Sequence, residues 1–160
     1  YGMMRWILRQ PRVAVVPVVG ETAKNTVNLV PSDYVMDALA YLSAQYSTLG
    51  KVLHLCDPHP RTVDTLLRLI GKAAGRKLLR VPLPGPVAKG TLRRVHPVQR
   101  LMQVTPESVD YFTHPTRYAC DATLQALEKS GLTCPPIESY MDTLVAYIRQ
   151  HPDVPSAAMV

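Results

Sequence analysis

The sequence predicts an α/β protein in which short strands alternate with single helices. Two observations carry this prediction. The β-branched run Val13–Val19 has the composition of a strand, and the apolar residues between Val63 and Ala73 recur at helical spacing. Strands that alternate with helices favour parallel pairing through crossover helices. We therefore expect a few parallel strands joined by crossover helices, with a mostly helical, lid-like region beside them.

Four segments in the first half of the chain are predicted to be strands, because each is short, apolar and bounded by turn residues. They are Val13–Val19, Val27–Val30, Lys51–Cys56 and Arg80–Leu83. Pro17 is expected to break the first of them, since proline has no N–H for a strand ladder. The third closes in the turn sequence Asp-Pro-His-Pro, which begins at Asp57.

Helices are predicted around these strands from their caps and their apolar stripes. The first covers Gly2–Arg9 and is stopped by Pro11. Ser32 is expected to cap the second helix, and Asp33 in its first turn suits the positive end of the helix dipole. Thr62 is expected to cap the third helix, which then ends at Gly75 in the usual left-handed position.

The alternation fails beyond Pro84, where the chain becomes irregular and lid-like. We predict a brief strand at Thr116–Cys120, a helix capped by Asp121 that ends near Gly131, and a final helix opened by Pro136. The domain prediction has three parts. They are residues 1–83 as an α/β segment, 84–151 as a mostly helical substrate-binding or capping region, and 152–160 as a flexible tail.

Composition points to a globular chain in a reducing compartment. Hydrophobic residues make up 47% of the 160 residues, and no apolar run approaches the roughly 18 residues that would span a bilayer. Cys56, Cys120 and Cys134 are an odd number at unequal spacing, which suits neither a disulfide framework nor a zinc site. We expect reduced, buried thiols and a cytoplasmic location. Because Tyr1 is not a methionine and no signal peptide follows it, the chain is expected to begin inside a longer protein.

The net charge of +6 is concentrated in one interval. Between Thr65 and Pro106 there are nine basic residues and no acidic one. This interval predicts either a surface that attracts anions or an ordinary solvated face. Nucleic acid is the least favoured anion, because aromatic residues are not interleaved with these cations.

Catalytic and cofactor motifs are missing from the sequence. No glycine-rich phosphate loop follows a strand, and no Tyr-x-x-x-Lys pair is present to transfer a proton. His59 in the Asp-Pro-His-Pro turn is read as turn chemistry rather than as a metal ligand. The segment Tyr111–Tyr118, which includes His114, is the favoured place for polar contacts to a ligand or another lobe.

The strand-to-helix elbow at residues 28–31 is a second candidate for contact with a substrate. Ligands of open α/β sheets gather beyond the carboxyl ends of the strands, and ordinary core packing is the alternative for this segment. Its residues are Asn28, Leu29, Val30 and Pro31.

The order of the segments resembles the carboxyl-terminal half of an extended short-chain dehydrogenase/reductase. The segments are NLVPSDYVMDALAYL, GKVLHLCDP, RTVDTLLRLIGKAAGRKLLRVPLP, a basic stretch, YACDATLQALEKSGL and a last helix ending YIRQHPD. This is the group that holds the NAD-dependent epimerases and dehydratases. The form NLVPSDYVMDAL is more similar to the thioester-reductase, or male-sterility, branch.

The resemblance implies a substrate-binding portion of an NAD(P)-dependent oxidoreductase that acts on a carbonyl or an acyl thioester. NAD(P) and the catalytic Tyr and Lys would belong to a preceding Rossmann half, so this chain has no catalytic residue and is inactive alone. The implied partners are that half or a second copy, with a CoA-linked or carrier-linked anionic substrate. Substrate-binding candidates beyond the elbow are Arg93, Tyr111 and His114. A free-standing adaptor domain with a basic face is the alternative function.

Overall fold

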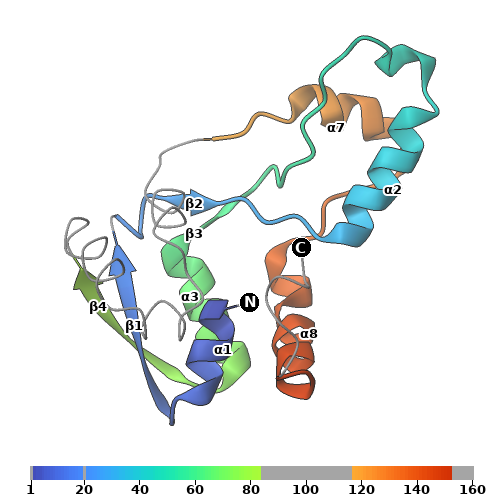
Figure 1. Ribbon diagram of the computed structural model, residues 1–160. Helices are drawn as coiled ribbons and strands as arrows, with labels where there is room; N and C mark the ends of the chain where they lie inside the picture. Colours follow the sequence, from blue (N-terminus) through green and yellow to red (C-terminus); the bar gives the residue numbers. More distant parts are fainter. Residues whose placement is uncertain (1, 20, 84–116, 153–160) are drawn as a thin grey trace, which may run out of the picture.

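The fold was analysed in a computed structural model that describes residues 2–19, 21–83 and 117–152 (Figure 1). The longer elements are α1 Gly2–Arg9, β1 Val13–Val19, α2 Ser32–Ser43, α3 Val63–Ala74, β4 Lys77–Leu83, α7 Asp121–Leu127 and α8 Ile137–Gln150. The shorter ones are β2 Thr26–Val27, η1 Tyr46–Thr48, β3 Arg61–Thr62 and η2 Glu128–Ser130. The predicted α/β class is confirmed. Arg93, Tyr111 and His114 lie outside the described residues, so they stay predictions.

β1 and β4 form a parallel two-stranded sheet, which confirms the expected parallel pairing. The register runs from Val13 opposite Lys77 to Val19 opposite Leu83. β4 therefore begins three residues earlier than the predicted Arg80–Leu83 strand. β4 begins at Lys77 because the Lys77 N–H donates to the Arg12 carbonyl at 2.9 Å, which is the first hydrogen bond between the two strands.

Pro17 does not break β1, contrary to the prediction. In a parallel ladder the N–H groups of successive residues point to opposite edges, so those of residues two apart point to the same edge. The Val15 N–H points away from β4 and donates to the Gln10 side chain at 2.9 Å. Because Pro17 is two residues further along, its nitrogen also faces away from β4, and no ladder bond is lost.

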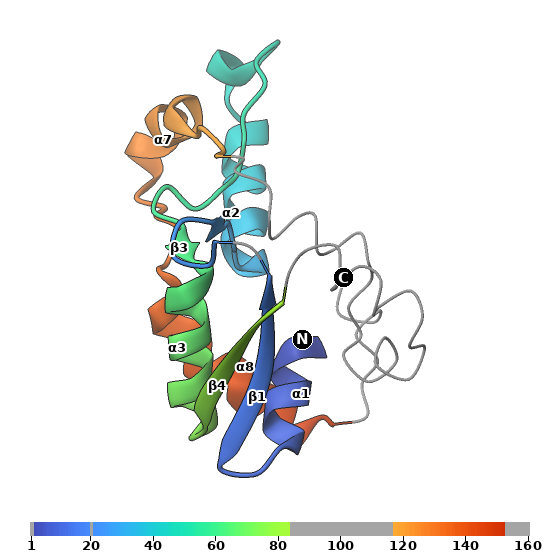
Figure 2. The ribbon, with the colours of Figure 1, turned by 90° about the vertical axis from the view of Figure 1, so that its left-hand side faces the viewer.

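α1, α3 and α8 pack together on one face of this sheet (Figures 1 and 2). Their shared core includes Ile7, Leu67, Met141 and Val145, together with Val16 from β1. α3 has the predicted caps. The Thr62 hydroxyl accepts a hydrogen bond from the Thr65 N–H at 3.2 Å, and Gly75 has a φ of 63°. α8 begins after Pro136, as predicted. It belongs to the region predicted to cover residues 84–151, and the division of the chain into three regions stays a prediction.

None of the described helices packs on the other face of the sheet. Paired residues of a parallel ladder project to the same face, so the residues opposite one another in register share it. Val13 is 52% exposed and Leu79 is 55% exposed on this face, and Val15 and Val81 are exposed beside them. A parallel sheet is normally covered on both faces.

The strand predicted at Val27–Val30 is wrong in extent and pairing. Only Thr26–Val27 is a strand, and it pairs antiparallel with Arg61–Thr62. Beyond Val27 the chain leaves this pairing because the Asn28 side chain bonds to the backbone of Asp57. The N-cap of α2 is Pro31 rather than Ser32, and Pro31 makes no side-chain cap bond.

The strand predicted at Lys51–Cys56 is also wrong, since this segment has no regular secondary structure. It lies against residues 117–123 but is held there by side chains instead of a ladder. The Thr123 hydroxyl donates to the His54 carbonyl at 2.8 Å, and the His54 ring lies 3.3 Å from the Ala119 carbonyl oxygen. The described residues of the strand predicted at Thr116–Cys120 are likewise not a strand.

A second, smaller core joins α2 and α7. Its buried residues are Tyr34, Ala38, Leu42 and Leu127. Cys120, not Asp121, is the N-cap of α7, and it makes no side-chain cap bond. The η2 turn after α7 ends at Gly131 with a φ of 72°, as predicted. In the described part of the chain, no helix is long and apolar enough to cross a membrane.

Candidate functional site

The elbow at residues 28–31 lies on the carboxyl side of the parallel sheet. Figure 1 shows the tips of β1 and β4 pointing toward β2 and β3, and the elbow continues from β2 into α2. This is the side of an α/β sheet on which ligands gather. The structure therefore places the four predicted elbow residues where a substrate site is expected.

Asn28 is the residue that ties the elbow to the rest of the molecule. Its side-chain amide donates to the Asp57 carbonyl at 2.9 Å, and its side-chain oxygen accepts from the Asp57 N–H at 2.9 Å. Both ends of the amide are used, so the side chain is fixed in one orientation. Asn28 thus positions the elbow against the turn that begins at Asp57.

The Asp57 turn has the geometry that the sequence predicts. Asp57 is only 7% exposed, and its side-chain oxygen accepts from the His59 N–H at 2.8 Å. A carboxylate bonded to a backbone N–H two residues on is an Asx turn. Among the described residues, no group of three or more His, Cys, Asp or Glu side chains could hold a metal.

The other three elbow residues differ in exposure. Val30 packs against the second core, and Pro31 occupies the N-cap position of α2. Leu29 is 38% exposed. Leu29 is therefore the elbow side chain most available to an apolar part of a ligand, while Asn28 and Val30 hold the backbone in place.

Two thiols and two phenols near the elbow have raised pKa values. Burial raises the pKa of Cys56 to about 12, and a hydrogen bond with the Cys120 side chain adds to the shift. Burial also raises the pKa of Cys134 to about 11, with the Asp57 carboxylate as the second cause. All three cysteines are free; Cys56 and Cys120 are buried, as predicted, whereas Cys134 is half-buried. Because the thiolate is the reactive form, Cys56 and Cys134 are unsuited to nucleophilic catalysis.

The phenols behave in the same way. Burial raises the pKa of Tyr140 to about 12, and burial also raises the pKa of Tyr34. The Tyr140 hydroxyl is buried without a hydrogen-bond partner among the described residues. A phenol with a raised pKa is a poor proton donor at neutral pH, so neither Tyr34 nor Tyr140 is suited to acid catalysis there.

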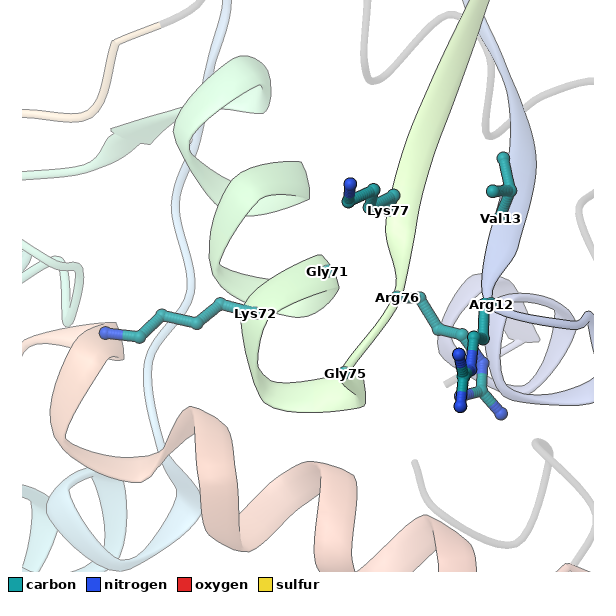
Figure 3. Close-up of a pocket in the computed structure, with 7 residues that line it drawn as sticks. All are labelled: Arg12, Val13, Gly71, Lys72, Gly75, Arg76 and Lys77. Atoms are coloured by element: carbon teal, nitrogen blue, oxygen red, sulfur yellow. The ribbon is translucent and has the colours of Figure 1, made fainter.

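A strongly basic hollow lies at the opposite, amino-terminal end of the sheet (Figure 3). Its volume is about 610 Å³. Four cations and two glycines line it: Arg12, Lys72, Arg76, Lys77, Gly71 and Gly75. The sequence marks the basic interval that begins at Thr65, but it does not place Arg12 there. Only the register of β1 on β4 brings Arg12 beside Lys77.

No protein-family model matches the sequence, and no curated protein matches it either. Among solved structures, the chain is similar to the terminal R domain from the myxalamid PKS-NRPS biosynthetic pathway, with a TM-score of 0.67 and 20% sequence identity. That match covers 96% of this chain and 38% of the R-domain chain.

The chain is also similar to the Citrobacter sp. triphenylmethane reductase complexed with NADP(H), with a TM-score of 0.57 and 15% identity. This match covers 81% of the chain and 44% of the reductase. The chain thus spans less than half the length of both structures. At these identities the likeness is one of fold, and it supports the predicted Rossmann-like α/β fold.

Proposed function

We propose that this chain is the substrate-binding, carboxyl-terminal portion of an NAD(P)-dependent oxidoreductase that reduces or oxidises a carbonyl or an acyl thioester. The observation that carries the proposal is the fold match to the R domain, which includes 96% of this chain but only 38% of the domain. The thioester branch is preferred because the better of the two matches is to that R domain.

The elbow is the proposed substrate contact. It lies on the carboxyl side of the sheet, its backbone is fixed by Asn28, and Leu29 is exposed there. Arg93, Tyr111 and His114 are proposed to contribute from the segment between β4 and α7. The free thiols behind the elbow suit a reducing, cytoplasmic compartment.

NAD(P) is proposed to bind outside this chain. The sequence contains neither a glycine-rich phosphate loop nor a Tyr-x-x-x-Lys pair, so the chain alone has no means to bind the dinucleotide or to donate the proton. The open apolar face around Val13 and Leu79 supports a covering partner. We propose that a preceding Rossmann half, or a second copy of the chain, covers it.

The test compares the chain alone with the same 160 residues joined to an NAD(P)-binding half. We expect NADPH oxidation with an acyl-CoA thioester only in the joined protein. In that protein, Leu29→Asp should raise the KM for the thioester severalfold and leave the KM for NADPH unchanged. Met36→Asp, at a position of α2 that is exposed in this chain, is the matched control. Turnover by the chain alone, or equal effects of the two variants, would contradict the proposal.

An adaptor function with a basic face is the second candidate, and the basic hollow is the observation that favours it. The adaptor function differs from the reductase function because it does not require a dinucleotide. An adaptor binds its anionic partner with the same affinity whether or not the NAD(P)-binding half is attached.

A further inference from the structure

The backbone of the basic hollow and one of its cations are fixed by hydrogen bonds. Arg12 and Lys77 are neighbours, because the Lys77 N–H donates to the Arg12 carbonyl. The Arg76 guanidinium is oriented by its Nε, which donates to the Gln10 carbonyl at 3.1 Å. Gln10 is itself tied to the backbone of Val15. The Arg76 guanidinium and the backbone of Arg12 and Lys77 are thus in place before any ligand arrives.

Stabilisation of a helix end does not account for these cations. Basic residues often gather at a helix C-terminus because the last carbonyls carry partial negative charge. At the end of α3, however, those carbonyls already have partners. The N–H groups of Gly75 and Arg76 donate to Lys72 and Gly71, and Arg149 donates to the Ala74 carbonyl at 2.7 Å.

Nearby carboxylates do not neutralise the hollow either. None of the described residues that line it is acidic, and the closest acidic residue along α3, Asp64, is engaged by Arg80 and Arg68. In the described ranges, Arg12, Lys72 and Lys77 form no ion pair. Like charges around one hollow repel one another, so an anion placed among them would be favoured.

The geometry points to a binding site for a small molecule that carries two or more phosphate groups, held chiefly by Arg12 and Arg76. In Figure 3 the Arg12 and Arg76 side chains are drawn together at the start of the two strands, whereas Lys77 points toward α3 and Lys72 points away from the two arginines on the other side of α3. Guanidinium forks match phosphate oxygens in pairs. Because four cations line the site, we infer a ligand with several negative charges, such as a diphosphate. This site is at the far end of the sheet from the elbow and goes beyond the proposed reductase function.

The test is a calorimetric titration of the full chain with inorganic pyrophosphate at low salt. We expect saturable binding that weakens steeply as salt is added. Arg12→Gln with Arg76→Gln should weaken it by about tenfold or more, since a charge-assisted hydrogen bond contributes about 1.5–3 kcal/mol. The control, Lys51→Gln with Lys129→Gln, removes the same charge at exposed positions elsewhere and should leave affinity within about twofold. Matched thermal unfolding confirms that each variant is folded.

Two further measurements keep the outcomes distinct. Pyrophosphate should shift the backbone NMR signals of Gly71, Gly75 and Lys77 and leave those of Asn28 and Asp57 in place. Arg12→Lys with Arg76→Lys should recover only part of the affinity, because the charge returns without the fork. Absence of saturable binding, full recovery by the lysine variant, or tighter binding of an acidic polypeptide than of pyrophosphate would each overturn the proposal.

Discussion

The part of the molecule around the parallel sheet and the part around α2 and α7 differ in the size of their buried cores. Among the described residues, eleven from α1, β1, β2, α3 and α8 form one buried core around the parallel sheet. Four of the described residues form the buried core around α2 and α7, and the segment between Gly50 and Asp57 has no regular secondary structure. We call these the sheet region and the elbow region.

The two regions are stabilised by different kinds of interaction. The sheet region is stabilised by burial of apolar side chains. This stabilisation is proportional to the buried apolar area and has no preferred direction. The elbow region relies on directed polar contacts, such as those from Asn28 to Asp57 and from Thr123 to His54. Regions with few buried apolar contacts open more readily, and ligand-binding segments are commonly drawn from them.

The largest expected effect comes from removing a core leucine in the sheet region. Leu67→Ala should lower the free energy of unfolding by about 3–5 kcal/mol, because the surrounding helices and strand cannot close the cavity. Leu127→Ala in the elbow region should lower it by only about 2–3 kcal/mol, since fewer packed neighbours surround it. Urea unfolding measures both. Equal losses would contradict the distinction between the regions.

The next effect tests the polar clamp of the elbow region. Asn28→Ala should cost about 1–3 kcal/mol, because it leaves the N–H and the carbonyl of buried Asp57 without their partner. Asn28→Asp should cost a similar amount, since it keeps an acceptor but places a second carboxylate beside Asp57. Gln125→Ala, at an exposed position of α7, is the control and should stay within about 0.5 kcal/mol of wild type.

The elbow region should also be the source of alkaline sensitivity. Cys56 and Cys134 have folded-state pKa values of about 12 and about 11, above their ordinary value of 9.0. Their contribution to stability is complete below pH 9 and is lost as the pH rises toward 11 and 12, because the unfolded chain then releases protons that the folded chain retains. Unfolding between pH 8 and pH 11 measures this. Cys56→Ala with Cys134→Ala should flatten the decline, and an unchanged slope would contradict the assignment.

The smallest effect is expected from the prolines at the sheet edges. Pro17→Val and Pro82→Val should each change stability by less than about 1 kcal/mol, because both nitrogens face away from the partner strand. The added N–H groups should increase self-association at high concentration, since they extend an unprotected strand edge. Sedimentation measures the association. A large loss of stability in either variant would contradict the assignment that the proline nitrogens face away from the partner strand.

Elements with their own local signals were predictable from the sequence. The helix between Thr62 and Gly75 has a capping hydroxyl, an apolar stripe and a left-handed glycine, and the structure contains all of them. Val13–Val19 is so strongly β-branched that even its proline does not end it. The final helix was also predictable, because Pro136 marks its start.

Elements that depend on a partner were not predictable. Lys51–Cys56 has the composition of a strand, but it meets Ala119 and Thr123 through side chains, which no local pattern reveals. The Asn28 clamp joins residues that are 29 positions apart. The basic hollow depends on the register that sets Arg12 beside Lys77, so its charges could be counted from the sequence but not assembled.

The most direct test of the account is whether this chain binds the dinucleotide by itself. NADPH fluorescence, titrated with the purified 160-residue chain at physiological salt, measures this without relying on turnover. Physiological salt and a pyrophosphate competitor separate a dinucleotide site from the basic hollow. We predict no saturable NADPH binding that survives excess pyrophosphate, because the sequence contains no glycine-rich phosphate loop. Saturable, pyrophosphate-resistant binding of NADPH would contradict the assignment of this chain as the substrate-binding portion alone.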